Sequence, residues 1–220
     1  MPLFPLVGLG IGISAGVVAF SLSQLLPPLI VGLLTLGALL LLTGLHHTDG
    51  LLDFGDGLMC KGSREQKIGA MRDTVTGVGG HSLGLVILLT TAFAISSFQP
   101  SEALSTVAVS ETAAKASMVL AAGVGKSASP GLNTPFIDAM HGRLRALRVF
   151  VPLATVLVVG FSWTGYAGVA SAIAGFLATL LLVRISAGHF GGLTGDVFGA
   201  INEIARLAAL VTFLGALRWR

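Results

Sequence analysis

The segment from Leu3 to Leu45 reads LFPLVGLGIGISAGVVAFSLSQLLPPLIVGLLTLGALLLLTGL and decides the fold class. It contains no Asp, Glu, Lys, Arg or His. A membrane-spanning helix needs about 20 consecutive apolar residues, so the segment is long enough for two such helices. Pro27 and Pro28 divide it, because proline interrupts the interior of a helix. The segment therefore predicts two transmembrane helices, at roughly 3–22 and 27–45.

The composition of the whole chain carries the same signal. Of its 220 residues, 54% are hydrophobic and 10% are charged, whereas soluble domains carry about 25% charged residues. The 30 glycines suit closely packed membrane helices. We therefore expect a single domain over residues 1–220, an all-α, polytopic integral membrane bundle of six to seven transmembrane helices. The further predicted spans are roughly 82–98, 102–122, 148–163, 165–184 and 199–217.

The polar residues gather in three linkers, 46–81, 123–147 and 185–198, whereas the other turns carry no Lys or Arg. Because basic loops stay on the cytoplasmic side, all three linkers are predicted to face the cytoplasm from the cell membrane. Seven spans would place the C terminus outside, which Arg218 and Arg220 fit poorly. The net charge of +3 is read as a topology signal, and no nucleic-acid partner is expected.

An acidic cluster opens the first of these linkers. Asp49, Asp53 and Asp56 have i, i+4, i+7 spacing and share one stripe of a helix. Like charges so placed repel one another, and a bound cation is the usual remedy. Oxygen-only ligands suit Mg²⁺, with Mn²⁺ or Ca²⁺ as alternatives. His46 shares the stripe while His47 does not, and the competing interpretation is a solvated helix start that favours acids.

Basic residues and glycines follow the acids. Lys61, Arg64 and Lys67 share one side of a short helix, which the Ser63 and Gln66 capping box is predicted to open and which runs through Met71. They are either a positive-inside patch or an anchor for a phosphate-bearing substrate. After Arg72, a glycine-rich turn containing Gly77 and Gly80 offers backbone N–H groups to phosphate.

The last linker leads into a helix through Gly192, Thr194, Gly195 and Asp196. A helix N-terminus behind a glycine-rich turn is a ready anion site, although Thr194 or Asp196 could simply be an N-cap. Deeper in that helix, Glu203 is a functional candidate because charges inside a membrane are costly. It could instead only pair with Arg206 at i, i+3. Glu111 and Lys115 form a similar i, i+4 pair.

Three stretches resemble one known family, the cobalamin synthases. They are HTDGLLDFGDG at 47–57, MRDTVTGVGG at 71–80 and GGLTGDVFGAINE at 191–203. The resemblance covers essentially the whole chain, in the family's motif order. The family usually has further residues before the segment FPLVG, and Ser129 stands near a place that often carries Arg.

The resemblance implies a reaction between adenosylcobinamide-GDP and α-ribazole or its 5′-phosphate, which yields adenosylcobalamin or its phosphate and GMP. It implies Mg²⁺ on Asp49, Asp53 and Asp56, and catalytic roles for His47, Asp73 and Asp196. It also implies membrane lipid as surroundings, with a homo-oligomer and other corrinoid-pathway enzymes as further partners. The substrate-binding candidates are His46, Lys61, Arg64, Lys67, Arg72, Gly77, Gly80, Gly192, Thr194, Gly195 and Glu203.

Two alternatives compete with this interpretation. A divalent-cation transporter should carry acids near the middle of several spans, whereas these acids lie at helix ends beside basic loops. A CDP-alcohol phosphotransferase should carry Gly-x-x-Ala-Arg between its aspartate pairs, and DGLLDFGDGLMCKG at 49–62 has no Ala-Arg.

Overall fold

The computed structural model describes residues 3–131 and 133–217, which contain ten helices and no strand. Arg218 and Arg220, which bear on the predicted topology, lie outside these ranges. The all-α prediction is confirmed. The helices are α1 (Phe4–Leu22), α2 (Pro28–Leu42), α3 (His46–Met59), α4 (Arg64–Met71), α5 (Val78–Ser96), α6 (Pro100–Val124), α7 (Thr134–Met140), α8 (Arg145–Thr164), α9 (Tyr166–Phe190) and α10 (Gly195–Leu217).

Six of the described helices, α1, α5, α6, α8, α9 and α10, are long and apolar enough to cross a membrane. The 15-residue α2 is too short alone, but α2 and α3 together make a seventh candidate that is bent by 97°. The prediction of six to seven spans is thus confirmed. At the bend, Gly44 and Leu45 both have a φ of 64°, a left-handed conformation that stops α2 before α3 begins.

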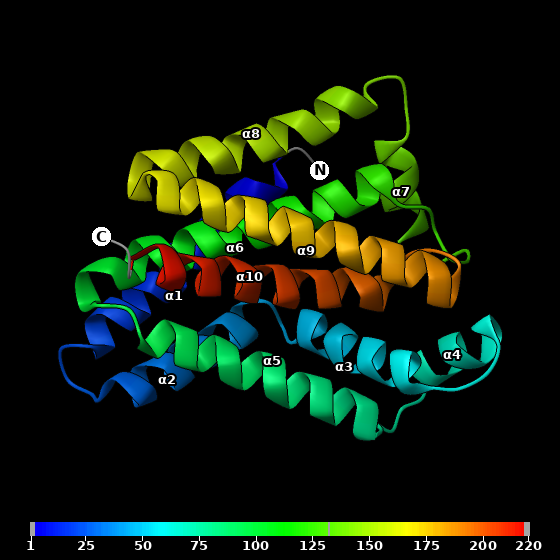
Figure 1. Cartoon of the computed structure of the whole chain (residues 1–220), viewed down its shortest axis with the longest axis horizontal. Coiled ribbons are helices and arrows are strands. Elements are labelled where there is room, and N and C mark those ends of the chain that lie inside the picture. Colours follow the sequence, from blue (N-terminus) through cyan, green and yellow to red (C-terminus); the bar gives the residue numbers. More distant parts are fainter. Residues whose placement is uncertain (1–2, 132, 218–220) are drawn as a thin grey trace.

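Helix α6 runs through the centre of the bundle and contacts α1, α8, α9 and α10 (Figure 1). All its residues from Thr106 to Gly123 are buried. On α1, Gly8, Gly12 and Gly16 form the face that meets α6. A Cβ on Gly12 would stand 2.6 Å from the Cα of Ala108, so only glycine allows this approach. Small residues spaced by four are typical of close helix packing in membranes.

The three polar linkers lie at one end of the bundle. Figure 1 shows α4, α7 and the turn between α9 and α10 at this end, with the α5–α6 and α8–α9 turns at the other. Two linkers are joined directly, because the Leu193 N–H donates to the Lys126 carbonyl at 2.7 Å and the Ala128 N–H donates to the Leu193 carbonyl at 2.9 Å. The three linkers thus lie at one end of the bundle, and the cytoplasmic side stays a prediction.

Candidate active site

A pocket of about 260 Å³ opens at the polar end of the bundle. All three predicted linkers contribute to it, although they are far apart in the sequence. Its lining residues are Ile68, Met71, Arg72, Ser129, Pro130, Gly131, Asn133, Thr194, Gly195 and Asp196. It therefore combines a carboxylate, a guanidinium and the N-terminus of α10. Asn133 was missed by sequence reasoning, because nothing in its local pattern separates it from an ordinary loop residue.

Four aspartates come together where α3 packs against α10. Asp53 interacts with the charges of Asp196, Asp49 and Asp56. The predicted stripe on α3 is thus present, and α10 adds a fourth carboxylate. Glycine makes this approach possible, because a Cβ on Gly50 would lie 2.8 Å from the Asp196 carbonyl oxygen.

This donor set fits a hard divalent cation by its chemistry. The charges acting on Asp53 all come from other aspartates, and such a group is stabilised by a cation with oxygen ligands. Across residues 3–131 and 133–217, no three acidic, histidine or cysteine side chains already converge on a metal-binding point. The carboxylates are neighbours whose side chains must turn toward one another to share an ion.

Asp56 has a second role that the sequence did not predict. Its carboxylate accepts hydrogen bonds from the Gly77 N–H at 2.7 Å and the Gly80 N–H at 2.8 Å. These groups belong to the first turn of α5, which has no side-chain cap of its own. The N–H groups of Gly77 and Gly80 were predicted to bind phosphate, but in the structure they donate to the Asp56 carboxylate.

The two histidines are separated by the geometry of α3. The helix is regular from His46 onward, so His47 lies off the acidic stripe. His46 is exposed, whereas His47 is half-buried and its ring interacts with the charges of Lys115 and Glu111 in the bundle interior. His47 is not among the residues that line the pocket. The structure thus does not favour His47 as the proton acceptor.

The basic residues predicted to anchor a phosphate lie on and around α4, at the same end of the bundle as the pocket. The capping box opens α4, as predicted, with the Ser63 N–H donating to Gln66 Oε1 at 2.8 Å. Lys61 and Arg64 are exposed, and Lys67 Nζ lies 3.0 Å from His189 Nδ1 on α9. Of the predicted basic residues, Arg72 alone lines the pocket, where its charge interacts with Asp196.

The start of α10 is capped as the N-cap interpretation predicted, and it also lies in the pocket wall. Thr194 caps α10, because its hydroxyl accepts from the Val197 N–H at 3.3 Å, and it also lines the pocket. Gly195 lies in the pocket wall. Gly192 is buried against the other linker, where a Cβ would stand 2.5 Å from the Lys126 carbonyl, so packing accounts for this glycine. Asp73 is exposed in the α4–α5 loop and accepts from the Val75 N–H at 3.1 Å.

Glu203, a candidate for substrate binding, does not line the pocket. It is fully buried and paired with Arg206, as the alternative interpretation proposed. Arg206 Nε also lies 3.1 Å from Glu111 Oε2, and Lys115 Nζ lies 2.6 Å from Glu111 Oε1. These two acids and two bases form a neutral network between α6 and α10, so Glu203 is a structural group and not a substrate contact. Because the charges of these buried acids are balanced by Lys115 and Arg206, they do not support the cation-transporter alternative.

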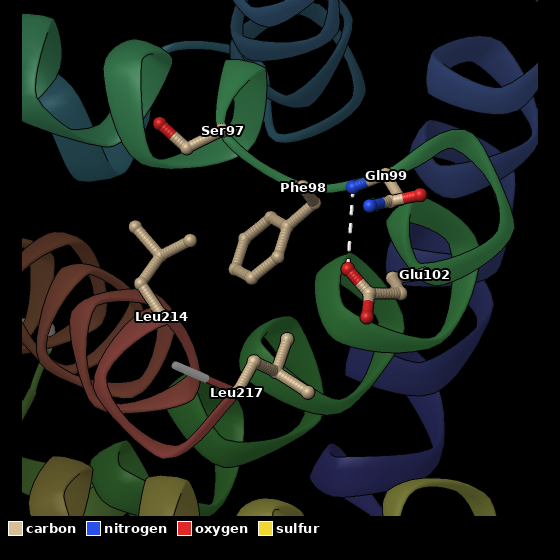
Figure 2. Close-up of a pocket in the computed structure, with 6 residues that line it drawn as sticks. All are labelled: Ser97, Phe98, Gln99, Glu102, Leu214 and Leu217. Carbon is tan, nitrogen blue, oxygen red and sulfur yellow. Dashed lines mark hydrogen bonds between the residues drawn. The ribbon is translucent and has the colours of Figure 1, made fainter. Parts of the chain in front are cut away.

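A second pocket lies at the opposite end, between the α5–α6 turn and the last turns of α10. Figure 2 shows the Phe98 ring there beside Leu214, with Glu102 close by. The Glu102 carboxylate accepts from the Gln99 N–H at 3.2 Å and so caps α6. Because its acid is engaged as a cap, this pocket lacks the chemistry of the first one.

A bundle with six described helices long and apolar enough to cross a membrane, and with an acid, an arginine and a helix N-terminus in one terminal pocket, has the features of a multi-pass membrane enzyme. Residues 1–214 match the family described as Cobalamin-5-phosphate synthase, and the chain belongs to this family. It is a membrane transferase of cobalamin biosynthesis.

Relatives named adenosylcobinamide-GDP ribazoletransferase support this assignment. That of Methanosarcina mazei is 32% identical over 98% of this chain and 86% of the relative. That of Methanosarcina barkeri is 35% identical over 94% of this chain and 79% of the relative. That of Thermococcus kodakarensis is 36% identical over 98% of this chain and 87% of the relative. No solved structure matches the chain.

Proposed function

We propose that the chain transfers the corrinoid phosphoryl group of adenosylcobinamide-GDP to α-ribazole or its 5′-phosphate. The ribose 3′-hydroxyl attacks the phosphorus that carries the corrinoid's aminopropanol arm. A new P–O bond forms, the bridging P–O bond of the diphosphate breaks, and GMP leaves with the bridging oxygen. The hydroxyl proton passes to a base. The observation that carries the proposal is a pocket that residues from all three polar linkers line, among them Arg72 and Asp196 from the second and third family-like stretches.

In this proposal the acids bind a metal ion and Arg72 binds a phosphate group. Asp49 and Asp53 lie on α3 close to Asp196 on α10, where they would hold Mg²⁺. When bound, this ion would neutralise the charge that develops on the diphosphate. Arg72 lines the same pocket and can pair with a phosphate oxygen through two N–H groups. The N-terminus of α10 begins in the same pocket wall, where its positive end would favour the same negative charge.

Asp196 is our candidate for the proton acceptor. It lines the pocket, whereas Asp73 and His47 do not. Its carboxylate accepts a hydrogen bond from the Thr194 hydroxyl at 3.3 Å, which orients it. A carboxylate within reach of the attacking hydroxyl can take up the proton as the new P–O bond forms.

We also place the pocket on the cytoplasmic side of the cell membrane. The first of the linkers that surround it carries Lys61, Arg64, Lys67 and Arg72. Basic segments of this kind stay inside during insertion. Both proposed substrates are charged, and a pocket facing the cytoplasm receives them without their crossing the membrane.

The test is an assay of GMP release by the purified protein in detergent. With adenosylcobinamide-GDP, α-ribazole and Mg²⁺, the wild type should release GMP, and EDTA should stop the release until Mg²⁺ is restored. Asp53→Asn should lower the rate by about 100-fold, because one charge of the cluster is lost. Asp138→Asn, a change at an exposed position on α7, is the matched control. No GMP from the wild type, or equal rates for the two variants, would refute the proposal.

A further inference from the structure

An apolar pocket of about 200 Å³ adjoins the polar one. The two share Asn133 and Gly195 in their walls. The other lining residues are Phe4, Met118, Phe136 and Phe198. Sites for small molecules usually have about 300–1,000 Å³, so this volume suits one ring system of a larger ligand.

Three aromatic rings from different helices build this pocket. The Phe4 ring of α1 lies edge to face with Phe136 of α7, with ring centres 5.6 Å apart. Phe136 lies in the same way against Phe198 of α10, at 5.8 Å. Edge-to-face packing holds rings in defined orientations, and all three of these phenylalanines border the pocket.

We infer that this aromatic pocket binds the planar base of α-ribazole, a ribosyl benzimidazole. The inference rests on the proposed function and assigns one part of its substrate to one part of the site. The base would lie among Phe4, Phe136 and Phe198, and the ribose would cross the shared wall at Gly195. The next residue along α10 is Asp196, which then meets the ribose hydroxyl that attacks.

The chemistry of the pocket selects this base over the other parts of the two substrates. Guanine carries several polar edge groups, which would lose their hydrogen bonds against phenylalanine and methionine side chains. The corrin ring system is far larger than the pocket. A benzimidazole has two fused, mostly apolar rings, and aromatic side chains stack well with such bases.

Gly195 provides a sharp test of the shared wall. A Cβ at this position would meet no atom of the described protein within 4 Å, so alanine fits the fold. Alanine also suits a helix better than glycine does. The added methyl group would project into the junction of the two pockets. Gly195→Ala should therefore impair the binding of α-ribazole while leaving thermal unfolding unchanged.

The experiment measures KM for each substrate separately by GMP release, together with binding of α-ribazole alone by its fluorescence. Phe136→Leu should raise KM for α-ribazole about tenfold, weaken its direct binding equally, and leave KM for adenosylcobinamide-GDP within twofold, and Gly195→Ala should weaken the direct binding of α-ribazole to the same extent. Phe98→Leu is the matched control, since Phe98 lines the pocket at the far end and packs edge to face with Phe213 (Figure 2).

Unchanged binding of α-ribazole in both variants would overturn the inference, as would an equal rise of both KM values in Phe136→Leu. A wild type that binds α-ribazole but releases no GMP would refute the proposed function alone. The direct titration of the two variants would then still decide what the aromatic pocket binds.

Discussion

Asp53 and Glu203 are carboxylates of one small bundle with opposite surroundings. The charges that act on Asp53 come from three further aspartates, and no cation of the protein is among them. Glu203 is fully buried and its charge is balanced by Arg206. Residue type alone does not separate these roles, because the difference lies in the charges that tertiary packing brings to each side chain.

Neutralising Glu203 should destabilise the whole bundle. Glu203→Gln removes one acid of a neutral, buried network and leaves Arg206 with one carboxylate partner fewer. Loss of one partner in a buried pair typically costs about 3–5 kcal/mol. Unfolding of the purified protein in detergent should shift accordingly, whereas Glu65→Gln at an exposed position should leave it unchanged. Full stability of Glu203→Gln would contradict the structural role.

The sequence could predict the acidic stripe but not the partners of each acid. The spacing of Asp49, Asp53 and Asp56 is local, and helix geometry alone places them together. The bonds from Gly77 and Gly80 to Asp56 join α3 to α5, so they depend on packing that spacing does not encode. The same holds for Asp196, which reaches Asp53 because α3 and α10 touch at Gly50.

At the scale of single helices, α1 shows how glycine fixes the packing. Gly8, Gly12 and Gly16 face α6, and a Cβ on any of them would stand within 2.8 Å of its backbone. Gly10 lies on the same helix, and a Cβ there would meet nothing within 4 Å. The same helix thus carries glycines that its contact with α6 requires and one glycine, Gly10, that no neighbouring atom requires.

Alanine should therefore act in opposite ways at two neighbouring positions. Gly12→Ala should lower stability by about 1–3 kcal/mol, because α1 must move away from α6. Gly10→Ala should be neutral or slightly stabilising, since alanine favours the helix. Both are measured by unfolding in detergent. Equal effects would show that the close contact between α1 and α6 does not govern stability.

The long apolar helices and the capped helix α4 were predictable from the sequence, whereas the bend after α2 and the short helix α7 were not. The run at 27–45 was expected as one span, but α2 ends at Leu42 and Gly44 and Leu45 turn the chain. An apolar run shows no sign of such a turn until its backbone is seen. Helix α7 was missed because its seven residues are too few for a periodic pattern.

At the scale of the whole molecule, chemistry is confined to one end. The three polar linkers are separated by long spans, yet they meet around one pocket. This outcome follows from alternation, because an even number of crossings returns the chain to the same face. The positions of the linkers were therefore predictable, while the shape of the pocket between them was not.

The orientation of this end can be checked through Cys60, the only cysteine of the chain. Cys60 directly follows α3 and is partly exposed. A membrane-impermeant maleimide should label it in inside-out vesicles and not in right-side-out ones. In a Cys60→Ser background, Tyr166→Cys at the other end should show the reverse, since Tyr166 is 81% exposed. Labelling of Cys60 from outside would contradict the proposed cytoplasmic orientation.

The buried network between α6 and α10 also bears on how the chain is made. Glu111 and Lys115 pair within α6, and Glu203 and Arg206 pair within α10. Each helix can thus enter lipid almost neutral, which reduces the cost of inserting its charges. Because α10 is synthesised after α1 to α9, the contact of Arg206 with Glu111 at 3.1 Å can form only when those helices have been made. This contact thus joins α10 to the helices made before it, and the same helix brings Asp196 to the other acids.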